Sequence, residues 1–277
     1  MAEECFAGLQ PHMSDIVING VRIHYYVWGM GSRDVVMIHG ITSSALSWWR
    51  VAPRLARAGY RVIALDMPGH GDSARPDISY AVDEAARLVD AWMAALGLDA
   101  PTVVGHSWGG SVTLSQATDP HRKVSPRSLL LVDPLLRTRA SQGYQFRDAL
   151  LKLLGRPRRE LIPILRKAYP RWHTCDIHWK AEALEKAAPS ALKGVFADNA
   201  GLELTSHLQA TPAPWCLMVA DPSLGGILPQ ALWPDLEEAA RTSTGVVRYL
   251  PGVSHDIHRE DFDGFIVIVS EFLHQGS

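Results

Sequence analysis

Ser107 has a glycine two positions away on each side, in the sequence Gly105-His106-Ser107-Trp108-Gly109. A short β-branched run precedes this motif. The preceding residues 102–104 are typical of a buried strand, and the small residues after the serine suit the start of a helix. A serine on a one-residue bend between strand and helix is held in a strained backbone conformation that exposes its hydroxyl. Glycines beside it avoid collisions with neighbouring elements. The pattern predicts that Ser107 is a nucleophile.

The second requirement is a base, because a serine hydroxyl is a poor nucleophile near neutral pH. Histidine is the expected base, and the chain has 12 histidines, so position in the fold must select among them. His255 ends the sequence Pro251-Gly252-Val253-Ser254-His255, after the last expected strand and before the last expected helix. A loop there returns over the carboxyl edge of the sheet, where ligands bind in such folds. We expect His255 to be the base, with His258 as the second choice.

The third requirement is a carboxylate that orients the imidazole, and two aspartates between Ser107 and His255 end expected strands. Asp221 follows residues 215–220, and Asp133 follows residues 129–132. Each precedes a proline, and Asp-Pro pairs also start turns for purely local reasons. We expect the acid to be Asp221, and Asp133 is the alternative.

Backbone N–H groups that bind the negative oxygen of a tetrahedral intermediate complete such a site. Trp108, next to the serine, is expected to supply one donor. Ile41 is expected to supply the other, from the loop His39-Gly40-Ile41-Thr42, where the glycine permits a bend. A single histidine after a strand is more often a turn-stabilising residue, so His39 is assigned a structural role.

Short apolar runs separated by helical patterns predict the framework that positions these residues. The runs expected to form the inner strands are residues 35–38, 62–65, 102–104, 129–132, 216–219 and 246–250. Helical periodicity is clearest over residues 82–96 and 262–273. An opening hairpin is expected about Asn19-Gly20, because this pair supplies the positive φ of a tight hairpin turn. The alternation predicts an α/β fold with a doubly wound, mostly parallel sheet.

The strand pattern stops in residues 137–210, where helical stretches are broken by prolines. We expect this segment to be a helical cap, inserted into a core of residues 1–136 and 211–277. A basic stretch, residues 152–167, could receive a carboxylated substrate or touch an acidic surface, but we expect it to be a solvated helix face. Aromatic side chains of the cap would form an apolar wall over the site and favour a small, largely apolar substrate. They are Tyr144, Phe146, Tyr169, Trp172, Trp179 and Phe196.

Composition excludes several classes of partner. The chain has 27 Lys and Arg against 29 Asp and Glu, a formal charge of −2, which leaves no field to hold nucleic acid or an anionic membrane. The three cysteines, Cys5, Cys175 and Cys216, are far apart and form no CxxC, so we expect free thiols rather than disulfides or a zinc site. No metal or cofactor is expected.

The N-terminal residues carry acid and no long apolar stretch follows them, which predicts a cytoplasmic protein without a membrane segment. A homodimer is compatible with these features.

Four ordered motifs together resemble the α/β-hydrolase fold superfamily, in its capped branch of esterases, lactonases and carbon-carbon bond hydrolases. They are His39-Gly40, residues 66–73, the elbow at 105–110 and residues 251–255. The resemblance implies that residues 66–73 form a structural turn. In many relatives the acid lies at the position that holds Ser223 here, whereas in others it follows the preceding strand, where this chain has Asp133.

The resemblance implies a serine hydrolase that cleaves carboxylic esters or lactones through an acyl-serine intermediate. Dehalogenases and epoxide hydrolases of the superfamily use an aspartate at the elbow, so Ser107 argues against both chemistries. Two alternatives stay open. One is a carbon-carbon bond hydrolase or lyase that uses the same triad as a general base, and the other is a non-catalytic small-molecule receptor of the same fold.

Overall fold

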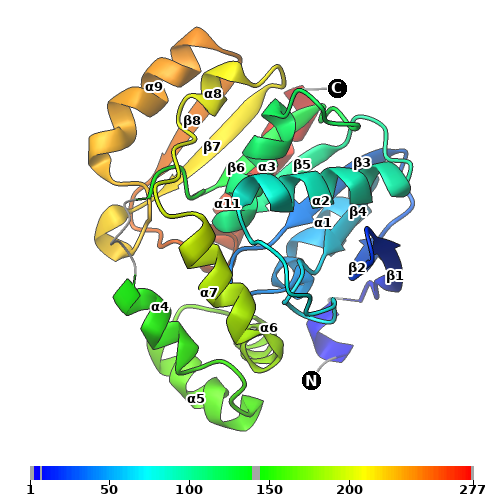
Figure 1. Ribbon diagram of the computed structural model, residues 1–277, viewed down its shortest axis with the longest axis vertical. Helices are drawn as coiled ribbons and strands as arrows, with labels where there is room; N and C mark the ends of the chain where they lie inside the picture. The colour runs from blue at the N-terminus through cyan, green and yellow to red at the C-terminus, as the bar shows by residue number, and fades with distance from the viewer. Residues whose placement is uncertain (1–2, 7, 139–143, 276–277) are drawn as a thin grey trace.

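The computed structural model describes residues 3–6, 8–138 and 144–275, and its centre is one mostly parallel sheet (Figure 1). Eight strands of this described part are arranged in the order β1-β2-β4-β3-β5-β6-β7-β8. The strand β2 pairs antiparallel with β1 and β4, and the other neighbours are parallel. The strands are β1 (His12–Ile18), β2 (Val21–Trp28), β3 (Arg33–Ile38), β4 (Tyr60–Leu65), β5 (Thr102–His106), β6 (Ser128–Val132), β7 (Trp215–Ala220) and β8 (Gly245–Leu250). The predicted α/β class and strand runs are confirmed.

The opening hairpin is also confirmed. Ile18 pairs with Val21, and the two residues between them, Asn19 and Gly20, have φ of 50° and 80°. A two-residue turn with positive φ at both positions matches the right-handed twist of the flanking strands. The local residue types therefore set this register.

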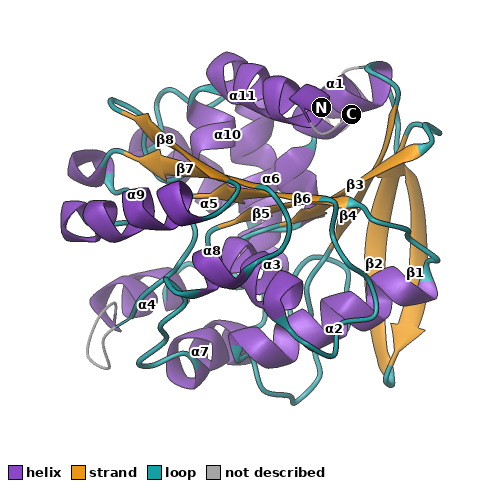
Figure 2. Ribbon diagram, turned by 90° about the horizontal axis from the view of Figure 1, so that it is seen from above, coloured by secondary structure: helices purple, strands orange, loops and turns teal. Residues whose placement is uncertain are grey.

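Helices cover both faces of the sheet, as Figure 2 shows. The helices α1 (Val51–Arg57) and α11 (Phe262–Gln275) lie on one face, and α2 (Val82–Ala95), α3 (Trp108–Thr118) and α9 (Trp233–Thr242) lie on the other. Successive residues of a strand point to opposite faces, so a strand covered on both sides must be apolar throughout. Val35, Val36, Met37 and Ile38 are accordingly all 0% exposed.

Helices fill the described residues between β6 and β7, where the sequence predicts a cap. In Figure 1 α4 and α5 lie at the lower left, away from the strands. An isolated bridge between Arg137 and Glu203 is the β-type pairing recorded for this segment. The helices are α4 (Tyr144–Leu151), α5 (Arg158–Ala168), α6 (Thr174–Lys186), α7 (Pro189–Asp198) and α8 (His207–Ala210). We retain residues 137–210 as the proposed cap.

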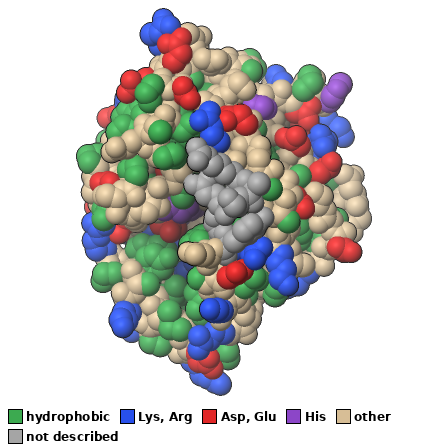
Figure 3. Space-filling view, turned by 60° about the vertical axis from the view of Figure 1, so that its left-hand side comes forward, with side chains coloured by type: hydrophobic (Ala, Val, Ile, Leu, Met, Phe, Trp, Pro, Cys, Tyr) green, Lys and Arg blue, Asp and Glu red, His purple; other side chains and the backbone are tan. Residues whose placement is uncertain are grey.

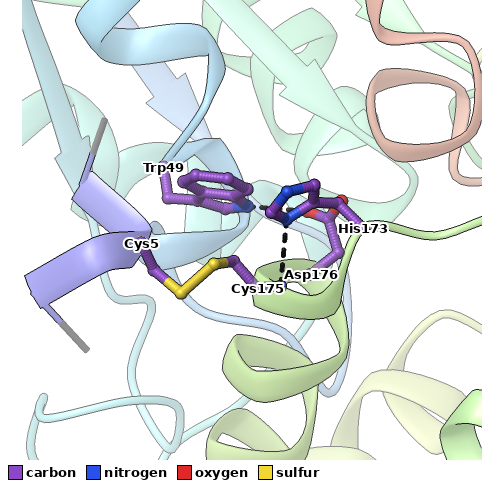
Figure 4. Close-up of a disulfide and its surroundings, with 5 residues drawn as sticks. All are labelled: Cys5, Trp49, His173, Cys175 and Asp176. Atoms are coloured by element: carbon purple, nitrogen blue, oxygen red, sulfur yellow. Dashed lines mark hydrogen bonds between the residues drawn. A yellow bond between two sulfur atoms is a disulfide. The ribbon is translucent and has the colours of Figure 1, made fainter. Parts of the chain in front are cut away.

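The predicted free thiols at Cys5 and Cys175 are wrong, because these residues form a disulfide (Figure 4). The bond joins the short 3₁₀ helix η1 (Glu3–Phe6) to the first turn of α6, across a sequence separation of 170 residues. The spacing of the two cysteines in the sequence does not indicate this disulfide, because only the fold brings them together. Cys216 is buried and free, as expected. In the described ranges, no helix is both long and apolar enough to cross a membrane.

We expect Cys175→Ser to lower the free energy of unfolding by about 2–4 kcal/mol, because the cross-link restricts the unfolded chain. Chemical denaturation with and without dithiothreitol measures the effect. The reductant should lower the wild-type midpoint to that of the variant and leave the variant unchanged. An identical wild-type midpoint under both conditions would show that the disulfide is absent or contributes nothing.

Candidate active site

Ser107 lies on a strained turn between β5 and α3, as predicted. Its φ of 55° and ψ of −125° lie in a region that residues other than glycine rarely adopt. The flanking glycines have no room for a side chain, since a Cβ on Gly105 would lie 2.4 Å from the Gly109 carbonyl oxygen, and one on Gly109 would lie 2.6 Å from that of Ile38. The Ser107 side chain is buried, and no described residue, His255 included, forms a hydrogen bond with its hydroxyl.

His255 lies in the loop after β8 and is oriented by Asp133, the residue that follows β6. His255 Nδ1 lies 2.7 Å from Asp133 Oδ2. Asp133 is completely buried, and its carboxylate also accepts hydrogen bonds from Ala220 N at 3.2 Å and Ile227 N at 3.0 Å. These contacts fix the carboxylate and, through it, the imidazole.

The expectation that Asp221 contacts His255 is wrong. Asp221 accepts hydrogen bonds from Ser223 N at 2.9 Å and Ser223 Oγ at 2.7 Å, and its other carboxylate oxygen accepts from Gly252 N at 2.9 Å. Asp221 therefore stabilises a local turn, as the aspartate of an Asp-Pro pair often does. Asp133 has the better position because β6 is the immediate sheet neighbour of β5, which leads to Ser107, whereas β7 is one strand farther away.

The hydrogen bond that His255 donates to Asp133 raises the proton affinity of the imidazole. Burial by itself would lower the pKa of His255, but the hydrogen bond and negative charge of Asp133 outweigh it, and the pKa is raised above the ordinary value of 6.5. When Nδ1–H donates to the carboxylate, Nε2 carries the lone pair. His255 is thus arranged to accept a proton at Nε2.

The loop after β3 lies directly against Ser107. A Cβ on Gly40 would be 2.9 Å from the Ser107 Cβ, so only a glycine permits this approach. No described residue accepts a hydrogen bond from Ile41 N–H or Trp108 N–H, the two predicted oxyanion donors. His39 braces the loop, because its Nε2 accepts from Met67 N at 3.0 Å and its Nδ1 donates to the Gly40 carbonyl at 2.7 Å. This geometry fits the structural role expected for His39.

His106 and His258 form a buried cluster beneath His255 that the sequence did not reveal. His106 Nε2 donates to the His255 carbonyl at 3.1 Å, which helps to hold the base. His258, the second-choice base, packs on His106 and Trp48, and no described residue forms a hydrogen bond with either of its ring nitrogens. Burial holds its pKa well below 6.5. It lacks the hydrogen-bonded carboxylate that orients His255.

The same cluster is the group of potential metal ligands found in the described residues. His106, Asp256 and His258 each offer one ligand atom, and these atoms lie within 4.8 Å of one another. However, Arg259 already binds Asp256, with its Nη1 3.0 Å from Oδ1. A guanidinium at this carboxylate opposes a metal cation, so we assign no metal here.

Lys180 of α6 reaches the loop beside Ser107, and the sequence analysis missed it. Its Nζ donates to the Thr42 carbonyl at 3.0 Å and to Thr42 Oγ1 at 2.9 Å. Burial, and then the charge of Arg259, lower the pKa of Lys180 to about 8. In the sequence, Lys180 lies four residues after Asp176, a spacing typical of an ordinary surface ion pair. Asp176 instead accepts a hydrogen bond from Trp49 Nε1 at 2.7 Å (Figure 4).

Comparisons with known proteins agree with this architecture. A family model described as alpha/beta hydrolase fold matches residues 35–155. N-formylmaleamate deformylase of Pseudomonas putida is 28% identical over 94% of this chain and 95% of its own length. The crystal structure of the N-formylmaleamic acid deformylase of Pseudomonas putida S16 superposes with a TM-score of 0.77 and 24% identity, covering 93% of this chain and all of that one.

A haloalkane dehalogenase of Agrobacterium fabrum is 34% identical, but the match covers only 44% of this chain and 39% of that protein. The similarity to the deformylase therefore extends over both chains, whereas that to the dehalogenase is confined to a part of each. Together the comparisons support a hydrolase function.

Asp133→Asn should lower the pKa of the His255 imidazole, because it removes the charge and the hydrogen bond that favour the protonated form. Asp221→Asn should leave that pKa unchanged. Proton–carbon NMR titration of the histidine rings measures both, with the His255 signal assigned from its loss in His255→Ala. A shift in the Asp221 variant alone would contradict the observed pairing.

Proposed function

This chain is a member of the α/β-hydrolase fold superfamily, and we propose that it acts as a serine hydrolase on small carboxylic esters or lactones. The observation that carries the proposal is the 2.7 Å contact between His255 and Asp133, two residues that follow strands of the same sheet, with Asp133 after the strand next to the one that leads to the strained Ser107. A nucleophile, a base and an orienting acid are the groups that acyl transfer needs.

In the proposed reaction Ser107 Oγ attacks the carbonyl carbon while His255 Nε2 takes its proton. The Ile41 and Trp108 N–H groups bind the oxyanion that develops. His255 then returns the proton to the leaving alcohol, and an acyl-serine remains. Water, activated by His255, releases the acid and restores the serine. Asp133 orients the imidazole and stabilises the imidazolium that forms.

One relative and the residue type at the elbow support acyl transfer over the other chemistries of the fold. The deformylase, by its name, removes a formyl group, which is an acyl group. The elbow of this chain carries Ser107 in place of the aspartate expected of a dehalogenase. An aspartate nucleophile forms an alkyl-enzyme ester, whereas a serine with a histidine base suits a carbonyl substrate.

An organophosphonate should modify the wild-type protein once, because Ser107 is the activated nucleophile. Intact-protein mass spectrometry measures the added mass, and Ser107→Ala should show none. Ser111→Ala is the matched control and should still react, since Ser111 Oγ donates to the Leu135 carbonyl at 2.6 Å and is not activated by a base. An unmodified wild type would contradict covalent catalysis. A protein that cleaves p-nitrophenyl esters without a pre-steady-state burst would instead favour general-base chemistry.

Asp133→Asn should lower kcat on a p-nitrophenyl ester by about 10³- to 10⁴-fold, because the imidazole loses its orienting partner. Asp221→Asn should stay within about 3-fold of wild type, as expected for a turn residue. Steady-state kinetics distinguish the two. Equal losses in both variants would remove the basis for choosing Asp133.

The pH dependence of kcat/KM tests the shifted pKa of His255. A protonated His255 cannot accept the serine proton, so kcat/KM should fall on the acid side with a midpoint above 6.5, the direction in which the pKa of His255 is shifted. Asp133→Asn should move this midpoint to lower pH. A midpoint that is the same in both proteins would show that Asp133 does not control the base.

A further inference from the structure

Lys180 is a half-buried cation that forms no direct ion pair with the described residues, although the charge of the nearby Asp256 acts to raise its pKa. Its two recorded partners are the neutral carbonyl and hydroxyl oxygens of Thr42. An ammonium has three donors, so one N–H remains for another acceptor. Removing a cation from water without a counter-ion is costly. A carboxylate at the remaining N–H would supply the hydrogen-bonded counter-ion that the described residues do not.

The nearby carboxylates are already committed to other cations or donors. Asp256 is bound by the Arg259 guanidinium at 3.0 Å, and Asp133 is bound by His255 and two backbone N–H groups. The side chain of Arg259 is 2% exposed, and its other terminal nitrogen donates to Ser43 Oγ at 3.0 Å. Lys180 is therefore the cation of this group that has no hydrogen-bonded carboxylate among the described residues.

The position of Lys180 ties this charge to the reaction centre. Thr42 directly follows Ile41, whose N–H is a proposed oxyanion donor, and consecutive Cα atoms are about 3.8 Å apart. The charge of Lys180 also reaches the rings of His39, His70 and His255, whose proton affinities it lowers. An anion bound at Lys180 would thus lie close to the scissile carbonyl.

Resting on the function proposed above, we propose that Lys180 binds a carboxylate of the substrate, so that the preferred substrates are short acyl compounds with a negative charge near the scissile carbonyl. The free N–H of the ammonium donates to this carboxylate, while Thr42 holds the other two donors. A compact ammonium on a flexible stem suits a single carboxylate oxygen. The ion pair between Lys180 and the substrate carboxylate positions the scissile carbonyl between Ser107 and the two oxyanion donors.

The basic stretch on α5, residues 152–167, is a less suitable anion site. Arg158 pairs with Glu182 and Glu185 of α6, and Arg156 pairs with Glu160. These cations already have partners within the cap. Their arrangement agrees with the solvated helix face that the sequence predicts.

The test compares two p-nitrophenyl esters with four-carbon acyl chains, the neutral butyrate and the hemisuccinate, which ends in a carboxylate. In Lys180→Met the charge is lost and the stem is kept. We expect KM for the hemisuccinate to rise about 10- to 100-fold more than KM for the butyrate does, which is the range for one charge-assisted hydrogen bond. Lys180→Arg should recover part of the loss for the hemisuccinate.

Lys193→Met is the matched control, because Lys193 is an exposed lysine of α7 in the same insert. It should leave both esters unaffected. A parallel loss on both esters in Lys180→Met would overturn the proposal and show that Lys180 only braces the oxyanion loop. An unchanged KM for the hemisuccinate would overturn it as well.

Calorimetric titration with succinate separates this inference from the proposed function, since it needs no turnover. Wild type and Lys193→Met should bind succinate more tightly than Lys180→Met, even if neither ester is hydrolysed. Hydrolysis of butyrate without succinate binding would keep the serine hydrolase and reject the carboxylate site.

Discussion

The buried carboxylate of Asp133 is the group on which the site depends. A fully buried carboxylate is tolerated only when it is paired and hydrogen-bonded, and Asp133 satisfies this with Ala220 N, Ile227 N and His255 Nδ1. These partners come from the end of β7, the segment after it and the loop after β8. One side chain therefore links three successive segments of the chain to the edge of the sheet where Ser107 lies.

The helix α6 is the main connection between the proposed cap and the rest of the site. Its first turn is linked to η1 by the Cys5–Cys175 disulfide and to Trp49 through Asp176, as Figure 4 shows. One turn later Lys180 reaches Thr42. Three attachments on one face restrict how far the helix can move from the oxyanion loop. A charge on such a helix can be positioned more accurately than one on a mobile loop.

Three of the cap aromatics, Tyr169, Trp172 and Trp179, pack against other described residues, whereas Phe146 is largely exposed and the side chain of Tyr144 lies outside the described part. Tyr169 and Trp172 stack with their ring centroids 4.0 Å apart, Trp172 lies under the Arg259 guanidinium, and Trp179 packs against Phe6. Figure 3 shows hydrophobic, acidic and basic side chains interspersed on the face it presents. The composition of the cap indicated an apolar wall, but it did not indicate the positive charge that Lys180 places beside the oxyanion loop.

Local rules of the backbone allowed much of this protein to be predicted from sequence. The Asn19-Gly20 turn, the apolar strands and the glycine-flanked Ser107 all depend on φ preferences or on burial of a few consecutive residues, which neighbouring residue types determine. The tertiary structure alone decided which distant groups meet. It placed β6 beside β5, and so selected Asp133 over Asp221, it joined Cys5 to Cys175, and it brought Lys180 to Thr42. Such contacts depend on strand order and helix packing, and these are properties of the whole chain because each is set by the sum of many weak long-range contacts.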